Sequence, residues 1–251
     1  MIHFVGAGSG APDLITLRGK ALLEQADTVI YAGSLVNPAL LDFCKPGCEI
    51  FNSAKMTLEE VLAVMRRAEA AGKNTVRLHT GDPSIYGAIR EQLDELDKIG
   101  IGWDICPGVS SFCGAAASLG IEYTLPDISQ SVIITRMAGR TPVPEKENMA
   151  SLAAHGATMV IFLSTGLLAE LSQELIDGGY DPASPAAIVY KASWPDEKIV
   201  RGTVAELPRM ALENGIRKTA LVIVGGCLGG EYARSRLYAP DFATEFREAR
   251  P

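Results

Sequence analysis

The sequence predicts an α/β protein with two domains. Short β-rich runs alternate with runs of helical period along the chain, which is the pattern of strands joined by crossover helices. The spacing of this alternation changes near residue 120. The length of 251 residues, 47% of them hydrophobic, suits two cores in domains of about 100–150 residues each.

The first half has the pattern of a parallel sheet covered by helices. The capping box Thr57-Leu58-Glu59-Glu60 begins one helix, whose apolar stripe runs to Ala68 and ends before Gly72. A second apolar stripe, which ends before Gly100, consists of Ile85, Ile89, Leu93 and Leu96. The strands expected in this half are Ile2–Val5, Asp27–Tyr31, Glu49–Asn52, Thr75–Leu78 and Trp103–Cys106.

The second half repeats the alternation with a different spacing. The expected strands are Ser131–Arg136, Met159–Leu163, Ala186–Tyr190, Ile199–Thr203 and Ala220–Val224. The expected helices lie near Glu147–Ala154, Leu167–Ile176 and Val204–Glu213. The segment from Gly120 to Ser129 is polar, contains a proline and lacks periodicity, so we place the boundary there, with domains of residues 1–120 and 121–251. The more polar tail from Gly229 on is expected to lie over the surface or a partner.

Charge and composition argue against several classes of protein. The 23 basic and 30 acidic side chains give a net charge of −7 without any block of five or more like charges, which disfavours a general nucleic-acid or membrane-surface binder. The first residues enter an apolar run without a basic region and a cleavable apolar segment, so we expect no signal peptide. No apolar run approaches the about 18 residues of a membrane helix. The five cysteines include no C-x-x-C pair, so we expect a cytoplasmic protein without a metal site.

The stretch FVGAGSGAPDLIT, Phe4 to Thr16, satisfies the G-x-G-x-x-A variant of the dinucleotide fingerprint. A dinucleotide site needs the glycine turn to run straight into a helix, and an acidic residue about 20 residues later. Here Pro12 and Asp13 interrupt the turn, and the second strand ends in Tyr31-Ala32-Gly33-Ser34 without a carboxylate. The loop therefore favours a ligand that approaches the main chain without a pyrophosphate, over NAD or a tight turn with no ligand.

The segment HTGDPSIYG, His79 to Gly87, lies at the carboxyl end of a strand, where open α/β sheets place ligands. Asp82 followed by Pro83 is also the pattern of a helix N-cap with proline at the first helical position, which explains the pair without a ligand. The preceding Thr80-Gly81 favours the ligand interpretation, because glycine there lets a ligand lie against the main chain.

A third strand-to-helix junction reads CPGVSSFCGAA. Pro107 and Gly108 make the turn, and Ser110 or Ser111 either caps the helix or donates a hydrogen bond to a ligand. Ser110 is not expected to be a hydrolase nucleophile, because the G-x-S-x-G spacing is absent and no histidine follows in a triad order. Three such loops at one edge of one sheet predict a crevice.

Basic residues near predicted loops are candidates for an anion site. Lys55, Arg136, Arg140 and Lys191 suit an anionic substrate in an otherwise acidic protein. Each of them alone is more often a solvated surface charge. We take Lys55, Arg136 and Arg140 as the substrate-binding candidates.

Six segments of the chain are similar to one family. They are VGAGSGAPDLITLRG, VIYAGSLVN, LHTGDPSIYGAIREQ, PGVSSF, SVIITRMAGRTPVPEKE and AIVYKASWPDE. Together they resemble the tetrapyrrole methylases, the S-adenosylmethionine-dependent enzymes of cobalamin and siroheme synthesis, over roughly Ile2 to Leu237. YAGSLVN and TRMAGRTPVPE are specific to one branch, which implies methylation of ring carbon 11 of precorrin-4 or cobalt-precorrin-4.

The resemblance implies two α/β domains, the second with a mixed sheet, S-adenosylmethionine in the cleft between them, and a homodimer. The cofactor-binding positions that it implies are Ser9, Thr80, Gly81, Asp82, Ile85, Ser110, Ser111, Leu163, Ala187 and Thr219. Two residues depart from relatives. Ala11 stands where an acidic residue is common, and Ala32 stands where the uroporphyrinogen-methylating branch has an aspartate, which argues against that branch.

Three other functions fit parts of the sequence. A methylase of RNA ribose or of a translation factor, from the same superfamily, predicts an electropositive groove, which the net charge does not favour. An NAD-dependent oxidoreductase predicts a carboxylate at the end of the second strand. A non-catalytic sensor of adenosyl nucleotides predicts that the chain lacks a substrate cavity.

Overall fold

The computed structural model describes residues 1–33, 35–230 and 232–250. Ser34, which belongs to the branch-specific segment YAGSLVN, lies outside the described residues, as do Glu231 and Pro251 of the tail. The chain divides into two compact units. Unit 1 consists of Met1–Ser118 and Lys191–Glu197, and unit 2 consists of Leu119–Tyr190 and Lys198–Pro251.

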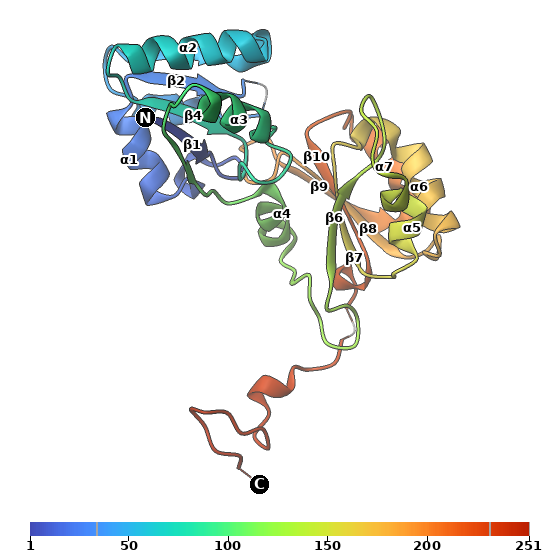
Figure 1. Cartoon of the computed structure of the whole chain (residues 1–251). Helices are drawn as coiled ribbons and strands as arrows, with labels where there is room; N and C mark the ends of the chain where they lie inside the picture. The colour runs from blue at the N-terminus through green and yellow to red at the C-terminus, as the bar shows by residue number, and fades with distance from the viewer. Residues whose placement is uncertain (34, 231, 251) are drawn as a thin grey trace. The chain divides into compact units, whose positions relative to one another are not determined.

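Unit 1 is built on a parallel sheet of five strands in the order β3-β2-β4-β1-β5 (Figure 1). The strands are β1 (Ile2–Gly6), β2 (Thr28–Tyr31), β3 (Glu49–Asn52), β4 (Thr75–His79) and β5 (Trp103–Cys106). Each strand predicted for this half is present, with its ends shifted by at most one residue. The predicted parallel sheet is therefore confirmed, and the carboxyl ends of all five strands lie at one edge.

Helices cover both faces of this sheet. The α-helices are α1 (Leu17–Gln25), α2 (Leu58–Ala70), α3 (Arg90–Lys98) and α4 (Ser111–Leu119), and the 3-10 helices are Pro12–Leu14, Pro38–Phe43 and Ser53–Lys55. The predicted capping box begins α2, because Thr57 Oγ1 accepts from Glu60 N at 3.3 Å and Glu60 Oε2 accepts from Thr57 N at 2.8 Å. The apolar stripe of α2 is buried and packs against β1 and β2, while α1 covers the opposite face.

The helix expected over the second apolar stripe begins later than predicted. α3 starts at Arg90, and Asp82 begins a turn in which its Oδ1 accepts a hydrogen bond from Ser84 N at 2.9 Å. The interpretation of Asp82 as a helix N-cap is therefore wrong. The physical reason is the backbone of Tyr86 and Ala88, whose φ angles of 54° and 48° are left-handed and interrupt any right-handed helix before Arg90.

Unit 2 is built on a mixed sheet in the order β6-β7-β10-β8-β9. The strands are β6 (Val132–Arg136), β7 (Thr158–Phe162), β8 (Pro185–Tyr190), β9 (Lys198–Thr203) and β10 (Ala220–Val224). β6 and β7 are parallel, and the other neighbours are antiparallel, so the mixed sheet is confirmed. The α-helices are α5 (Met149–Ala153), α6 (Leu168–Asp177) and α7 (Leu207–Glu213), and the 3-10 helices are Glu145–Glu147, Thr165–Leu167, Val204–Glu206, Gly226–Leu228 and Arg236–Tyr238.

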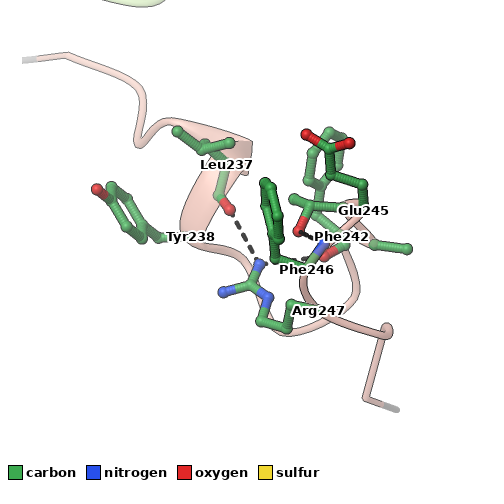
Figure 2. Close-up of a pocket in the computed structure, with 8 residues that line it drawn as sticks. Leu237, Tyr238, Phe242, Glu245, Phe246 and Arg247 are labelled. Atoms are coloured by element: carbon green, nitrogen blue, oxygen red, sulfur yellow. Dashed lines mark hydrogen bonds between the residues drawn. The ribbon is translucent and has the colours of Figure 1, made fainter.

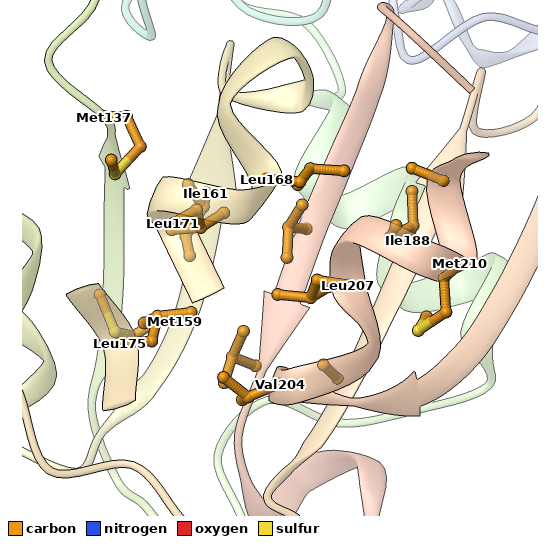
Figure 3. Packing of buried hydrophobic residues seen from close by; sticks show 14 of the residues in the cluster. Met137, Met159, Ile161, Leu168, Leu171, Leu175, Ile188, Val204, Leu207 and Met210 are labelled. Carbon is orange, nitrogen blue, oxygen red and sulfur yellow. The ribbon is translucent and has the colours of Figure 1, made fainter. Parts of the chain in front are cut away.

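The core of unit 2 lies between one face of this sheet and its three α-helices. Figure 3 shows Met159 and Ile161 of β7 directed toward Leu171 and Leu175 of α6, all four of them fully buried. Burying side chains of this size is worth about 1.5–3 kcal/mol each. This packing fixes the sheet and thereby the loops at its edges.

The tail is folded on itself around an arginine. Arg247 Nη2 donates to the carbonyl oxygens of Leu237 and Phe242 at 2.9 and 3.0 Å, beside the residues drawn in Figure 2. It also donates to the carbonyl oxygen of Ala239 at 2.8 Å. Aromatic side chains line the surface hollow beside it, and Phe246 is 90% exposed. Within the described ranges, no helix of the chain is both long and apolar enough to cross a membrane.

Candidate functional site

Three loops of unit 1 meet at the carboxyl ends of β1, β4 and β5. Ala7 N donates to His79 O at 2.7 Å, and Gly81 N donates to Gly8 O at 2.9 Å, which bridges the glycine loop to the loop after β4. Gly108 N, in the loop after β5, donates to Asp82 Oδ2 at 2.8 Å. The predicted convergence of the three loops is therefore present.

The glycines of these loops are required because the loops contact one another. A Cβ at Gly6 would lie 2.6 Å from both Gly108 Cα and Gly81 O, and a Cβ at Gly108 would overlap Gly81 O. Gly81 has a φ of 61°, and a Cβ there would lie 3.3 Å from Ser111 N. The sequence suggested that glycine leaves this main chain open to a ligand, but in the structure other loops occupy the space beside Gly6, Gly81 and Gly108.

Asp82 holds the loop after β5 against the loop after β4. Its partial burial acts to raise the pKa of the carboxyl group, but hydrogen bonds from the Ser84 hydroxyl, from Gly108 N and from Ser84 N outweigh it, so the pKa lies below its ordinary value. The carboxylate is therefore charged at neutral pH, and its role in this structure is to brace Gly108. Ile85 N donates to Asp82 O at 3.3 Å in the same turn, and its side chain is half-buried.

Two neighbouring side chains at the end of β4 have buried polar atoms without a hydrogen-bond partner among the described residues. They are Nε2 of His79 and Oγ1 of Thr80. Burial, and then the charge of Arg77, lower the pKa of His79 to about 3, so the imidazole is neutral at physiological pH. An orphaned hydroxyl at Thr80 is what a ligand with a polar group would satisfy. Sequence reasoning selected Thr80 but not His79.

The serines predicted to bind cofactor lie at the same edge of unit 1. Ser110 is buried and its carbonyl accepts from Cys113 N at 3.0 Å and Gly114 N at 3.2 Å, while Ser111 is the first residue of α4. Ser9 is 5% exposed, and its Oγ lies 2.9 Å from Oγ of Ser193, so its hydroxyl already has a partner within the protein.

Leu163 and Thr219 lie at one edge of the unit 2 sheet. Leu163 follows β7, and Thr219 precedes the antiparallel β10. Thr165 Oγ1, in the 3-10 helix after Leu163, donates to the carbonyl of Ala220, the first residue of β10, at 3.3 Å. Their φ angles are left-handed, 53° for Leu163 and 58° for Thr219. Leu163 is also 66% exposed. Strained backbone and an exposed apolar side chain both occur preferentially at ligand sites.

Ala187 occupies a different position in the same sheet. It lies in the middle of β8, opposite Ile223 of β10, and is completely buried. Its neighbours Ala186 and Ile188 point into the core under α5, α6 and α7, so Ala187 faces the other side of the sheet. Ala187 can therefore contact a ligand only with its main chain, or with its methyl group on the face of the sheet away from α5, α6 and α7.

The predicted substrate-binding cations differ in their exposure and in their hydrogen bonds within the protein. Lys55 ends the 3-10 helix after β3 and is exposed, and Arg140 is exposed in the loop after β6. Arg136, at the end of β6, instead donates to the carbonyls of Met137 and Thr141 at 3.1 Å each and of Pro142 at 2.7 Å. Its guanidinium therefore shapes the loop that carries Arg140. Lys191, also weighed for this site, pairs with Asp196 at 2.6 Å.

Sequence reasoning missed the residues that hold the glycine loop from the second half of the chain. Ser193 contacts Ser9 and Ala11, and Glu197 in turn binds Ser193. The quoted segment AIVYKASWPDE contains both residues, but no local pattern reveals a partner 184 residues away.

Four of the five cysteines have thiols with a raised pKa. Among the described residues, no group of three or more His, Cys, Asp or Glu side chains is placed to hold a metal ion. Burial raises the pKa of Cys44 to about 11, and burial also raises the pKa values of Cys48, Cys113 and Cys227. These thiols are therefore protonated at neutral pH and are weak nucleophiles.

Residues 1–208 match the model of a protein family described as Tetrapyrrole (Corrin/Porphyrin) Methylases. The chain belongs to the tetrapyrrole methylase family. It is 56% identical to the cobalt-precorrin-4 C(11)-methyltransferase of Methanocaldococcus jannaschii, over 99% of this chain and 96% of that one. It is 43% identical to the precorrin-4 C(11)-methyltransferase of Pseudomonas aeruginosa, over 98% of both chains.

Solved structures agree with this assignment to the tetrapyrrole methylases. The X-ray structure of a cobalamin biosynthetic enzyme, cobalt precorrin-4 methyltransferase, matches with a TM-score of 0.89 and 48% identity, covering 91% of this chain and 96% of that one. The uroporphyrin-III C-methyltransferase from Thermus thermophilus, complexed with S-adenosylhomocysteine, matches with a TM-score of 0.74 and 26% identity, covering 91% and 93%. The family resemblance predicted from six short segments is confirmed.

Proposed function

We propose that this protein is an S-adenosylmethionine-dependent C-methyltransferase that methylates ring carbon 11 of precorrin-4 or cobalt-precorrin-4 in cobalamin synthesis. The observation that carries the proposal is likeness over nearly the whole chain, at 56% identity, to a relative with that name. A likeness of this extent includes both units and therefore the loops of both. The branch-specific segments YAGSLVN and TRMAGRTPVPE support the same substrate.

The residues present fit the cofactor. The buried hydroxyl of Thr80 has no partner among the described residues and lies where three loops meet. From unit 1, Ser9, Thr80, Gly81, Asp82, Ile85, Ser110 and Ser111 would hold it, and from unit 2, Leu163, Ala187 and Thr219. When bound, S-adenosylmethionine supplies an electrophilic methyl group on a sulfonium. Because the hydroxyl of Ser9 is engaged by Ser193, the proposed contact at Ser9 is made by the main chain.

The chain contributes to catalysis mainly by orientation. Methyl transfer to carbon is an in-line displacement, and holding two reactants in line removes much of the entropic barrier. The hydrogen bond from Gly108 to Asp82 and the bridge between Gly8 and Gly81 give the three loops a fixed geometry for this task. His79, with its pKa near 3, is a weak base, so we assign it no proton transfer.

We propose that the acetate and propionate groups of the substrate pair with Lys55, Arg136 and Arg140. Lys55 and Arg140 are exposed, and their positive charges can form ion pairs with the carboxylates of a substrate. Arg136, besides the proposed pairing with substrate, holds the loop of Arg140 through the carbonyls of Thr141 and Pro142. We further propose that the protein acts in the cytoplasm as a homodimer, as the family resemblance implies, without nucleic-acid or membrane partners.

The experiment is a methyl-transfer assay read by mass spectrometry, with metal-free and cobalt-containing precorrin-4 offered separately. We expect one of the two forms to gain the mass of one methyl group, and only when S-adenosylmethionine is present. K55A and R140A are expected to raise KM for the substrate by about tenfold each, as the loss of about 1.4 kcal/mol of binding would. R66A, which removes an exposed arginine of α2, is the control. Calorimetric titration with S-adenosylhomocysteine and with NADH separates the proposal from an oxidoreductase.

A further inference from the structure

A short segment between two strands of unit 2 packs in unit 1. Residues Lys191–Glu197, which we name the clasp, connect β8 to β9, yet they belong to the compact unit formed by Met1–Ser118. The clasp reads KASWPDE and lies against the glycine loop after β1. Nothing in the proposed function assigns it a role.

The clasp contacts three consecutive residues of the glycine loop. Ser193 Oγ lies 2.9 Å from Ser9 Oγ and accepts a hydrogen bond from Ala11 N at 3.0 Å. Between them, a Cβ at Gly10 would lie 2.5 Å from Trp194 Nε1 and 2.7 Å from Ala192 O. The clasp thus contacts Ser9 through its side chain and Ala11 through its main-chain N–H, and it packs closely against the Cα of Gly10.

A carboxylate anchors the clasp to α4. Glu197 Oε2 accepts from Ser193 N at 2.6 Å and from Ser118 Oγ at 2.5 Å. One turn earlier in α4, a Cβ at Gly114 would lie 2.6 Å from Ser9 Cβ and 3.6 Å from Ala192 Cβ, so only glycine permits this approach. The same helix begins at Ser111, and the clasp therefore ties the glycine loop to the helix that follows the third loop.

The clasp holds a strained conformation. Lys191 and Ser193 have left-handed φ angles of 48° and 64°. An ion pair of 2.6 Å between Lys191 and Asp196 closes the segment over Trp194, with Lys191 Nζ 5.0 Å from the centroid of the indole ring. Strain of this kind persists where surrounding contacts over-determine the backbone, and it is typical of functional segments.

We propose that the clasp is a positioning element for the cofactor, with Ser193 and Glu197 as its positioning residues. It fixes Ser9–Ala11 in the conformation that receives the adenosyl cofactor. This inference rests on the proposed function for the identity of the ligand. Ser193 orders the glycine loop before the cofactor binds. Without Ser193, ordering this loop would reduce the free energy of cofactor binding.

The test measures S-adenosylhomocysteine binding to the full chain by calorimetry. S193A removes both hydrogen bonds to the glycine loop and is expected to raise Kd about tenfold while kcat at saturating cofactor stays within about twofold of wild type. E197A is expected to weaken binding in the same way, and E197Q, whose amide oxygen still accepts from Ser193 N and Ser118 Oγ, to restore most of it. S151A and E170Q, exposed positions in α5 and α6 of unit 2, are the matched controls.

A second readout does not depend on the folding of S193A. In W103F, Trp194 is the single tryptophan, and we expect its emission to change on titration with S-adenosylhomocysteine with the midpoint given by calorimetry. The proposal is overturned if S193A binds as tightly as S151A, or if E197Q is as impaired as E197A, or if Trp194 emission does not respond while calorimetry detects binding. Wild type that binds no S-adenosylhomocysteine at all would instead refute the proposed function, and the role of the clasp with it.

Discussion

Replacing Asp82 by alanine is expected to lower the free energy of unfolding of unit 1 by about 2 kcal/mol. The change removes the acceptor of Gly108 N, at 2.8 Å, and of Ser84 N, at 2.9 Å. A hydrogen bond to a charged group contributes about 1.5–3 kcal/mol, and the partial exposure of this carboxylate places the sum of both near the low end of that range. D82N keeps one acceptor oxygen and is expected to lose about half as much. The loop after β5 then loses its brace, so binding of S-adenosylhomocysteine weakens in parallel.

Urea unfolding followed by tryptophan emission measures this loss, because Trp103 and Trp194 both belong to unit 1. The control is D94N, which breaks an exposed pair with Arg90 and is expected to cost less than about 0.5 kcal/mol. Since the folded pKa of Asp82 lies below the unfolded value near 3.8, its contribution is complete above that pH and is lost as the pH falls through the folded pKa. Equal losses for D82A and D94N at neutral pH would refute the bracing role.

Three further predictions concern neighbouring residues. G108A is expected to cost about 1–3 kcal/mol, because its Cβ would overlap Gly81 O, while G102A, whose Cβ would lie 3.7 Å from Met1 Sδ, serves as the neutral control in the same unfolding assay. The folded pKa of His79, about 3, lies below the unfolded value near 6.5, so as the pH falls below about 6.5 the unfolded state binds a proton before the folded state does. The free energy of unfolding therefore falls between about pH 6.5 and pH 3, and H79L is expected to lose this part of the pH dependence when stability is measured against pH. R136A is expected to reduce both thermal stability and substrate affinity, whereas R140A reduces affinity alone; identical melting curves would contradict the structural part of this claim.

Local chemistry made much of the fold readable from sequence. The strands of unit 1 are short apolar runs between turns. In the capping box, Thr57 and Glu60 bond each other's backbone N–H groups, so this helix start is also recognisable from local sequence. The convergence of the glycine loop with the loops after β4 and β5 follows from a parallel sheet, whose strands all end at one edge. The family resemblance then located the mixed sheet of unit 2, which strand spacing alone did not specify.

The features that sequence reasoning missed depend on tertiary contacts. An apolar stripe from Ile85 predicted a helix, but left-handed backbone at Tyr86 and Ala88 delays its start to Arg90. Arg136 was assigned to substrate on its charge, whereas its three carbonyl partners depend on the path of its own loop. The contact between Ser9 and Ser193 joins residues 184 positions apart and has no local signature.

The most direct test of the proposed activity is the position of the transferred methyl group. S-adenosylmethionine labelled with ¹³C in its methyl group would be incubated with the chain and the precorrin-4 form that gains mass, and the product examined by NMR. We predict a single new ¹³C methyl resonance correlated with ring carbon 11. A labelled methyl at another ring carbon, or no label in either form of the substrate, would contradict the account.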